Sequence, residues 1–298
     1  MDEPRLKLAI QKSGRLTDPS LDILARCGLK ISRGKEQLMA FGENMPLDVL
    51  FVRDDDIPDL VQEDVCDLGL VGLNVLEEKR LELAARGHPA RFQSVRTLDF
   101  GRCRLCLAVP EGQPYDGARS LEGRRIATTY PYLLESYLRE RAINAEIVTL
   151  SGAVEIAPRL GRADLICDLV STGSTLQANH LREVETVLES HAVLIRTPLG
   201  LPPLKDEWVE RLVMRLDGVQ QVRESKYIML HAPRSALEQI RSLLPGCEFP
   251  TIIPLEGSPD KVAVHAVCRE NVFWETLEQL KKAGASALLV LPVEKMLA

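Results

Sequence analysis

The sequence predicts an α/β protein built as a two-lobed body followed by a small ferredoxin-like domain. Strand and helix signals alternate through the first hundred residues, and a second alternating series begins near Cys103. A Pro-rich segment, PLGLPPLKDEW, separates both series from a C-terminal stretch whose signals follow the order βαββαβ. Alternating strands and helices favour mostly parallel sheets with helices on both faces, and βαββαβ is the split ferredoxin-like order. We therefore expect a cleft between two lobes and a separate C-terminal unit.

The first lobe is predicted from apolar runs that alternate with helical patterns. One helical pattern begins with an acidic residue and Pro19 in its first turn and ends at Gly28, which is the usual asymmetry of helix ends. The predicted elements are strand 6–11, helix 18–28, strand 47–53, helix 56–65 and a glycine-bearing strand 66–74.

The second lobe is predicted from a similar series. Its elements are strand 103–110, strand 124–131, helix 132–142, strand 145–150, helix 153–163 and strand 165–170. Residues 181–198 contain two further strand-like runs of ambiguous direction that could return to the first lobe. We assign residues 1–102 with 181–223 to the first lobe and its connecting helix, and residues 103–180 to the second.

The C-terminal unit is predicted to span residues 224–298, after a long helical pattern over 205–221. Its predicted elements are strand 226–233, helix 235–244, strands 248–256 and 261–268, helix 271–284 and strand 285–292.

Composition limits the kinds of partner. The formal net charge is −6, which favours neither a nucleic-acid nor a membrane surface. No run approaches the roughly 18 apolar residues of a membrane helix, and the first residues are acidic where a signal peptide is basic. We therefore expect a cytoplasmic protein in which any phosphate ligand is held by backbone amides and a few nearby cations.

Cysteine and histidine suggest no metal or nucleophile site. The seven cysteines are scattered, which indicates reduced thiols. Cys103 and Cys106 form a C-x-x-C, but three residues apart on a strand they face opposite ways. The five histidines lie in unrelated contexts and form no recognisable catalytic set.

The loop STGST, at 171–175, is the strongest candidate for a phosphate site. It lies between a predicted strand and a predicted helix start, where free N–H groups and the helix dipole favour an anion. Thr172, Ser174 and Thr175 add hydroxyls, and Gly173 lets the backbone approach closely. An ordinary capped turn is the alternative, since Ser and Thr are good N-caps. Asp168 precedes this loop at the carboxyl end of the sheet, where its carboxylate suits sugar hydroxyls.

Two cationic segments follow strands in the first lobe. In QKSGR, Lys12 and Arg15 offer charge to a polyphosphate, and Ser13 and Gly14 offer donors; solvated loop residues are the alternative. Arg53 ends an apolar strand and could clamp a diphosphate. The three aspartates after it could cap the next helix or approach Mg²⁺, and capping is the preferred interpretation.

Four further residues have both a structural and a functional interpretation. Gly69 and Gly72 could bring backbone close to a flat ligand or to a neighbouring helix. Glu155, near the start of predicted helix 153–163, could complement the helix dipole or contact ribose hydroxyls. Tyr130 could stack on a base or fill the cleft wall.

Taken together, the chain resembles the long form of ATP phosphoribosyltransferase. The stretches that carry the resemblance run the full length: QKSGRL, ARCGLKI, ENMPLDVLFVRDDDIP, DLGLVGLNVLEE, RIATTYP, ICDLVSTGSTLQAN, ESKYIMLHAP, PTIIPL and LVLPVEKM. The pattern of apolar strand, acid and T-G-S-T is similar to the phosphoribosyl-diphosphate loop of phosphoribosyltransferases. The resemblance implies a type II periplasmic-binding-protein-like catalytic body with an ACT-like regulatory domain.

The resemblance also implies an activity and its ligands. The family transfers phosphoribosyl from phosphoribosyl diphosphate to adenine N1 of ATP and uses Mg²⁺. This reaction is the first step of histidine biosynthesis, and histidine inhibits it. Family members form homohexamers that are built from dimers. Carried over to this chain, residues 171–175 seat the 5′-phosphate, with Asp168 and Glu155 near the ribose. Lys12, Gly14, Arg15 and Arg53 face the polyphosphates, and Gly69, Gly72 and Tyr130 line the nucleotide cleft. Thr251, Ala285 and Ser286 are the histidine candidates.

Three alternatives to this enzyme are weighed. A two-lobed ligand-binding protein without catalysis would explain the two-lobed body but not the appended C-terminal domain. A ligand-sensing transcription regulator lacks a helix-turn-helix segment before Leu6. A single-sheet nucleobase phosphoribosyltransferase carries an acid pair directly before T-G-x-T, whereas Leu169 and Val170 follow Asp168 here.

Overall fold

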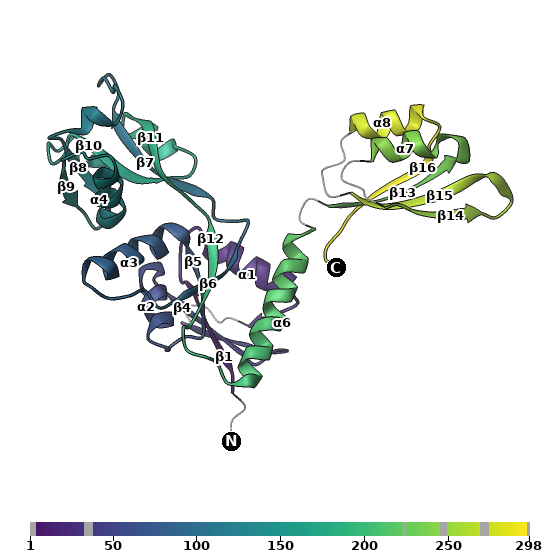
Figure 1. The fold of residues 1–298 in the computed structure, drawn as a ribbon, viewed down its shortest axis with the longest axis horizontal. Helices are drawn as coiled ribbons and strands as arrows, with labels where there is room; N and C mark the ends of the chain where they lie inside the picture. The colour runs from purple at the N-terminus through teal and green to yellow at the C-terminus, as the bar shows by residue number, and fades with distance from the viewer. Residues whose placement is uncertain (1–3, 33–37, 223–224, 245–248, 269–273, 297–298) are drawn as a thin grey trace. The chain divides into compact units, whose positions relative to one another are not determined.

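The computed structural model describes residues 4–32, 38–222, 225–244, 249–268 and 274–296. The chain forms two compact units, Met1–Ala25 with Leu29–Trp208 and Arg26–Gly28 with Val209–Ala298. The first unit contains two lobes, each with its own sheet, and the second contains one sheet (Figure 1). Within the described residues, no helix combines the length and the apolar character that a membrane crossing requires.

The sheet of the first lobe has seven strands in the order β2-β3-β4-β1-β5-β12-β6. β1 pairs in parallel with β4 and β5, and every other pair in this sheet is antiparallel. The expectation of a mostly parallel sheet is therefore wrong, because β3 runs opposite to β2 and β4, and β12 runs opposite to β5 and β6. The strands are β1 (Leu6–Gln11), β2 (Ile31–Ser32), β3 (Met39–Gly42), β4 (Leu47–Val52), β5 (Leu68–Gly72), β6 (Gln93–Thr97) and β12 (Ala192–Arg196).

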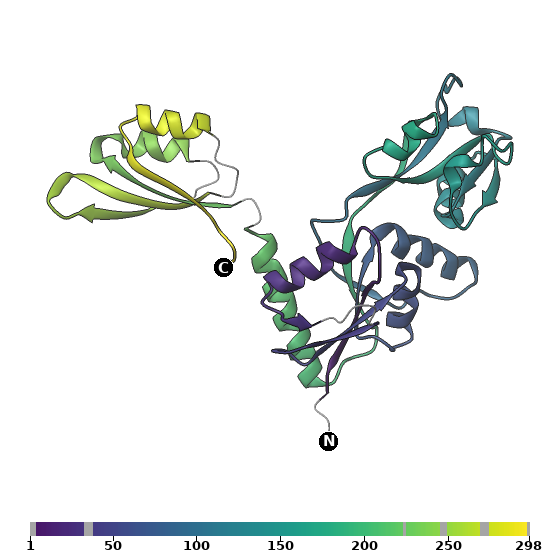
Figure 2. The ribbon, with the colours of Figure 1, turned by 180° about the vertical axis from the view of Figure 1, so that it is seen from behind.

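Helices cover both faces of this sheet. α2 (Ile57–Gln62) and α3 (Leu73–Ala85) pack on one face, in a core that includes Ala9 and Ile195. α1 (Thr17–Arg26) lies on the other side of the sheet, and both views agree on this (Figures 1 and 2). Helices 18–28 and 56–65 are thus confirmed, whereas α3 was not predicted.

The second lobe has a five-stranded sheet in the order β11-β7-β10-β8-β9. β8 pairs in parallel with β9 and β10, and β7 pairs antiparallel with β10 and β11. The predicted strands of this lobe and helix 132–142 are confirmed. The elements are β7 (Cys103–Pro110), η2 (Ala118–Leu121), β8 (Arg125–Thr128), α4 (Pro131–Glu140), β9 (Glu146–Thr149), η3 (Val154–Ile156), β10 (Leu165–Val170), α5 (Ser174–Ala178) and β11 (Leu181–Ser190).

Two expectations for this lobe need correction. Helix 153–163 is absent, and only the short η3 forms there. Pro158 falls beyond the first turn, where its missing N–H breaks a helical ladder. Residues 181–190 were assigned to the first lobe, but β11 pairs along its length with β7 of the second lobe. Only β12 returns to the first sheet, where it pairs with β5 and β6.

The two connections between the lobes are hydrogen-bonded to each other. The N–H of Ala192 donates to the carbonyl of Phe100 at 3.0 Å, and the N–H of Leu98 donates to the carbonyl of Ala192 at 2.8 Å. Gly101 has a left-handed φ of 68°, and an added Cβ there lies 2.3 Å from Cδ2 of the buried Leu16. The connection between the lobes at Gly101 therefore packs against Leu16, next to the loop that ends at Arg15.

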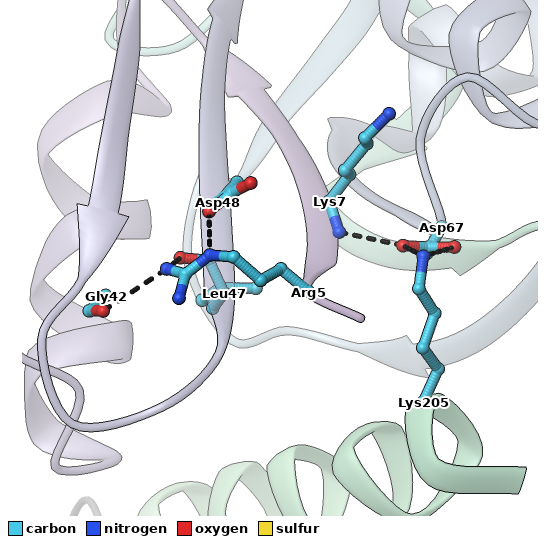
Figure 3. Close-up of polar contacts among 7 residues, drawn as sticks. All are labelled: Arg5, Lys7, Gly42, Leu47, Asp48, Asp67 and Lys205. Atoms are coloured by element: carbon cyan, nitrogen blue, oxygen red, sulfur yellow. Dashed lines mark hydrogen bonds and ion pairs between the residues drawn. The ribbon is translucent and has the colours of Figure 1, made fainter. Parts of the chain in front are cut away.

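Ionic contacts hold the opposite end of the first sheet. Asp67 accepts the N–H of Lys7 at 2.8 Å, and Lys205 of α6 (Pro203–Gln220) reaches its carboxylate at 2.8 and 3.0 Å. Arg5 pairs with Asp48 at 2.6 Å (Figure 3). These groups lie at the amino ends of β1, β4 and β5, away from the carboxyl ends that carry the candidate site residues. We interpret them as structural.

The second unit confirms the βαββαβ prediction. Its antiparallel sheet has the order β14-β15-β13-β16, which is the ferredoxin-like order, with α7 and α8 together on one face (Figure 1). Ile228, Leu230 and Val264 lie at its core. The elements are β13 (Lys226–Pro233), η4 (Arg234–Ala236), α7 (Leu237–Leu243), β14 (Thr251–Leu255), β15 (Ser258–Cys268), α8 (Trp274–Lys282) and β16 (Ser286–Pro292).

Candidate active site

The loop after β10 encloses a pocket of about 140 Å³ in the second lobe. Gly173 adopts φ 82° and is the N-cap of α5, so the chain turns sharply where a residue with a side chain is strained. The first N–H groups of a helix have no partner within the helix and can face an anion. The lining residues are Glu155, Asp168, Leu169, Val170, Ser171, Thr172, Gly173, Thr175 and Leu176.

Six of the predicted substrate residues are thus brought together on one pocket, and Ser174 is not among its lining residues. The hydroxyls of Thr172 and Ser174 lie 3.0 Å apart and hydrogen-bond each other. Ser174 therefore supports the loop from within. Although the predicted helix around Glu155 is absent, this residue still reaches the pocket, because η3 follows β9 on the same side.

Asp168 is the carboxylate of this pocket. It is half-buried, and one of its oxygens accepts the N–H of Leu169 at 2.8 Å. Burial and, to a smaller extent, the nearby charge of Glu155 raise the pKa of Asp168 to about 6 against the opposing effect of the Leu169 hydrogen bond. A carboxylate of this kind accepts hydrogen bonds from sugar hydroxyls at neutral pH and loses its charge in mild acid.

The loop from Lys12 to Arg15 is shaped by Gln11. The Gln11 side-chain oxygen accepts the N–H of Leu16 at 3.0 Å, and Thr17 donates its hydroxyl to the Gln11 carbonyl at 3.1 Å. Gly14 has φ 135°, and an added Cβ there lies 2.7 Å from the Gln11 amide nitrogen. The side chains of Lys12 and Arg15 are exposed, so both charges are available to a ligand.

Arg53 lies at the corresponding end of β4. It is exposed and directly precedes η1 (Asp54–Asp56). Asp56 occupies the N-cap position of α2 without a side-chain capping hydrogen bond, so the preferred capping interpretation is not supported. Burial and then the charges of Asp54 and Asp56 raise the pKa of Asp55, while Arg53 opposes the shift.

The two glycines of β5 have different surroundings. An added Cβ at Gly69 lies 2.6 Å from Ile57 and 3.1 Å from both Val61 and Ile195. Gly69 therefore permits close packing of α2 on the sheet, which favours its structural interpretation over the substrate-binding one. An added Cβ at Gly72 lies 2.5 Å from the Asn74 side-chain oxygen, so the absence of a side chain at Gly72 makes room for a buried polar group.

That polar group was not predicted. Asn74, in the first turn of α3, is 1% exposed and donates from its amide nitrogen to the Tyr130 hydroxyl at 2.9 Å. Its backbone N–H donates to the Ser190 hydroxyl at 3.1 Å, and that hydroxyl donates to the Asn74 oxygen at 2.8 Å. Ser190 follows Asn74 by 116 residues, so no local pattern signals the contact.

Tyr130 lies where acidic groups of both lobes act on one hydroxyl. It is half-buried after β8, and burial raises its pKa first. Asp54 and Asp55 of the first lobe and Asp168 of the second raise that pKa further, while the Asn74 hydrogen bond opposes the shift. Tyr130 is not among the residues that line the pocket after β10. Acidic groups of both lobes therefore raise the pKa of this one hydroxyl.

The three histidine candidates are separated in the second unit. Thr251 starts β14 and Ser286 starts β16, and these strands are the two edges of the sheet. Ala285, before Ser286, is buried. Three strand spacings of about 4.8 Å each separate the edges. One amino acid cannot contact Thr251 and Ser286 within a single chain.

The fold and the pocket define a class: a two-lobed, type II periplasmic-binding-protein-like α/β body with a pocket at the end of a strand, carrying a ferredoxin-like domain. The family model described as ATP phosphoribosyltransferase matches residues 53–218, and the model described as HisG, C-terminal domain matches residues 223–295. The chain belongs to the ATP phosphoribosyltransferase family. It is thereby a glycosyltransferase of histidine biosynthesis, and ATP and phosphoribosyl diphosphate are the substrates of the family.

Solved structures show two levels of similarity. The chain is 26% identical to the ATP phosphoribosyl transferase (HisG:HisZ) complex from Thermotoga maritima, with a TM-score of 0.57, over 71% of this chain and 98% of that one. It is 14% identical to the alkanesulfonate-binding protein SsuA from Xanthomonas axonopodis pv. citri, with a TM-score of 0.46, over 81% of this chain and 79% of that one.

Proposed function

We propose that this protein joins the phosphoribosyl group of phosphoribosyl diphosphate to adenine N1 of ATP and releases diphosphate. The observation that carries the proposal is the pocket formed by the loop 171–175 with Asp168 and Glu155. Its small hydroxyl side chains and backbone N–H groups suit a phosphate monoester, and its carboxylates suit the adjoining ribose.

In the second lobe, Ser171, Thr172, Gly173 and Thr175 hold the 5′-phosphate, and Ser174 stabilises the loop through Thr172. Asp168 and Glu155 accept hydrogen bonds from the ribose hydroxyls. Because both carboxylates contact the sugar, the anomeric carbon is held in a defined orientation. This orientation is the main requirement of the reaction, since no covalent intermediate with the protein is needed.

In the first lobe, the exposed Lys12, Arg15 and Arg53 face the polyphosphate groups, with Gly14 allowing close approach. The bond from N1 to the anomeric carbon forms as the bond from that carbon to diphosphate breaks. Negative charge grows on the departing diphosphate, and the three cations stabilise it. They also offset the repulsion between two polyanionic substrates. Gly72 accommodates Asn74, which hydrogen-bonds Tyr130.

Mg²⁺ is the proposed metal. Among the described residues, no cluster of three or more His, Cys, Asp or Glu forms a metal cage. Mg²⁺ usually keeps several waters and binds through one or two carboxylates and substrate phosphates, so a dedicated cage is not required. Asp54 and Asp55, beside Arg53, are the carboxylates that fit this use. When bound, the ion neutralises diphosphate charge.

Histidine is the proposed inhibitor, bound to the C-terminal unit near Thr251, Ala285 and Ser286. Since Thr251 and Ser286 lie on opposite edges of the sheet, a site that uses both requires two chains. The need for two chains at this site supports a homo-oligomer. The proposed oligomer is a hexamer built from dimers. A biosynthetic enzyme that consumes ATP is expected in the cytoplasm.

A single assay tests the proposal. Purified protein is mixed with ATP, phosphoribosyl diphosphate and Mg²⁺, and the absorbance of phosphoribosyl-ATP is followed with and without histidine. We expect product only when both substrates are present, and less product with histidine. Binding of either substrate without product would favour a ligand-binding protein instead. Product formation that is insensitive to histidine would overturn only the regulatory part.

A further inference from the structure

Leu16, the first residue after the loop that carries Lys12 and Arg15, lies between two glycines. It is 3% exposed, although the four residues before it are exposed. An added Cβ at Gly101 lies 2.3 Å from the Cδ2 atom of Leu16, and an added Cβ at Gly72 lies 3.8 Å from its Cδ1 atom. Each methyl group of Leu16 therefore lies beside one of these glycines.

Both glycines lie where the two connections between the lobes meet the first sheet. Gly101 lies in the connection from β6 to β7, and Ala192 follows the connection from β11 and begins β12. An added Cβ at Gly101 lies 3.6 Å from the Cβ of Ala192, and Gly72 pairs with Ala192 in the register of β5 and β12. Leu16 therefore packs against the segments that join the first lobe to the second.

The backbone around Leu16 transmits a displacement of this side chain to the loop. Its N–H donates to the Gln11 side-chain oxygen at 3.0 Å, and the N–H of Thr17 donates to the Gly14 carbonyl at 3.3 Å. These bonds tie the start of α1 to the loop. A closely packed interior leaves a buried leucine little freedom to rotate, so a group pressed against it shifts the backbone. Arg15, its neighbour in the chain, then moves with it.

We propose that Leu16 is a positioning residue, which sets where Arg15 stands relative to the connections between the lobes. This inference rests on the proposed function, because it takes Arg15 to act on the diphosphate of a sugar that the second lobe holds. A cation stabilises a leaving group only from the right place, and a displacement of about 1 Å can cost about 100-fold in rate. A loop that rests on the connections is placed with respect to both lobes at once.

The test compares two alanine substitutions at one backbone conformation in the full chain. Gly101 has φ 68° and Gly123 has φ 66°, so both variants carry the same backbone strain. An added Cβ at Gly123 meets no atom within 4 Å, whereas at Gly101 it meets Leu16. We expect a lower Tm for both, measured by thermal unfolding. At a temperature where both are folded, the kcat for phosphoribosyl-ATP should fall about 30-fold in Gly101→Ala. It should stay within about twofold in Gly123→Ala.

Two further variants show whether the effect passes through Leu16 and Arg15. Leu16→Val removes one carbon where Gly101→Ala adds one, so the double variant keeps the volume and should recover at least about fivefold in kcat. In the Arg15→Ala background, Gly101→Ala should lower kcat by less than about threefold, because its route to the reaction is already lost. The Kd of phosphoribosyl diphosphate, measured by calorimetry, should stay within about threefold in Gly101→Ala, since the pocket lies in the other lobe.

The outcomes are distinct. Equal kcat values for Gly101→Ala and Gly123→Ala would overturn the inference. No recovery in the double variant, an undiminished loss in the Arg15→Ala background, or a larger rise in the Kd would do the same. Each of these results leaves the proposed function intact, because the wild-type protein still forms phosphoribosyl-ATP. A wild-type protein that forms no product would overturn the proposed function and this inference with it.

A second variant covers a failure of Gly101→Ala to fold. Leu16→Ala removes the same contact from the other side without backbone strain, and we expect kcat to fall about 30-fold. Leu24→Ala is its control, because Leu24 is 1% exposed on the same helix, α1, and its loss leaves a similar cavity. It should keep the wild-type kcat, and equal kcat values for the two variants would overturn the inference.

Discussion

The carboxylate of Glu78, in α3 of the first lobe, accepts the backbone N–H of Tyr132, at the start of α4 in the second lobe, at 2.9 Å. Its other oxygen accepts the N–H of Leu133 at 2.8 Å. One side chain thus caps a helix to which it is not connected locally. Asn74, one turn earlier on α3, contacts Tyr130 before the same helix. The first two turns of α3 therefore hold the start of α4.

The first prediction concerns this cap. Glu78→Ala leaves two N–H groups without their acceptor, and we expect a loss of about 1–2 kcal/mol in the free energy of unfolding. Burial raises the pKa of Glu78, so its charge is costly where it lies. Glu78→Gln keeps an acceptor without that charge and should be the more stable of the two variants. Urea unfolding of both proteins measures the difference, and equal stabilities would refute the capping role.

The second prediction concerns Asp168 and pH. Its folded pKa of about 6 lies above the ordinary aspartate pKa of 3.8. Between these two pKa values, the folded state binds more protons at Asp168 than the unfolded state does. The contribution of Asp168 to the free energy of unfolding therefore falls as pH rises from about 4 to about 6, and at neutral pH the charged carboxylate destabilises the folded state. Asp168→Asn should raise stability at pH 7.5 by about 1–3 kcal/mol and have little effect below pH 4. Chemical unfolding at the two pH values tests this sign.

The same substitution should impair the enzyme. A neutral Asn cannot replace the charged acceptor for ribose hydroxyls, so kcat/KM for phosphoribosyl diphosphate should fall by roughly tenfold or more. In the wild-type protein, kcat/KM should fall as pH drops below about 6. The variant should lack this acidic limb. A limb that persists in Asp168→Asn would assign it to another group.

The third prediction concerns the loop backbone. Gly173→Ala places a side chain at φ 82°, which costs about 1–2 kcal/mol and reshapes the phosphate pocket. We expect a rise of roughly tenfold in the Kd of phosphoribosyl diphosphate. Gly87→Ala is the matched control, because φ is 74° and an added Cβ meets no atom within 4 Å. It should lower stability similarly without changing this Kd.

The fourth prediction concerns the first-lobe cations. Arg15 is exposed, so Arg15→Ala should change the free energy of unfolding by less than about 0.5 kcal/mol. It should lower turnover about 100-fold if the guanidinium stabilises charge on the departing diphosphate. Arg139→Ala removes the same charge from an exposed position at the end of α4 and should leave turnover unchanged. Turnover of Arg15→Ala equal to that of this control would remove Arg15 from the mechanism.

The fifth prediction separates structure from activity. Asp67→Asn leaves Lys205 near a neutral partner at the amino end of β5, and we expect a loss of about 3 kcal/mol. Adding Lys205→Met should recover part of this loss, because no unpaired charge remains. Both variants should keep wild-type kcat at a temperature where they are folded. A matching loss of kcat would show that this end of the sheet also serves the site.

Local patterns in the sequence determined most elements and the chemistry of the loop 171–175. The run LICDLV followed by STGST predicts a buried strand, a tight turn and a set of hydroxyls within a few residues. These features depend on neighbours along the chain, which explains why the strand and the pocket appear where expected. The βαββαβ order of the C-terminal unit was predictable for the same reason.

Only the tertiary structure decided which distant groups meet. Periodicity shows that a strand such as β11 has a buried face, but not that it pairs with β7 instead of joining the first sheet. The contacts from Asn74 to Ser190 and from Glu78 to Tyr132 join segments 116 and 54 residues apart. Polar groups of this kind become buried only because the folded chain supplies their partners. Their energies depend on geometry that no local stretch of sequence contains.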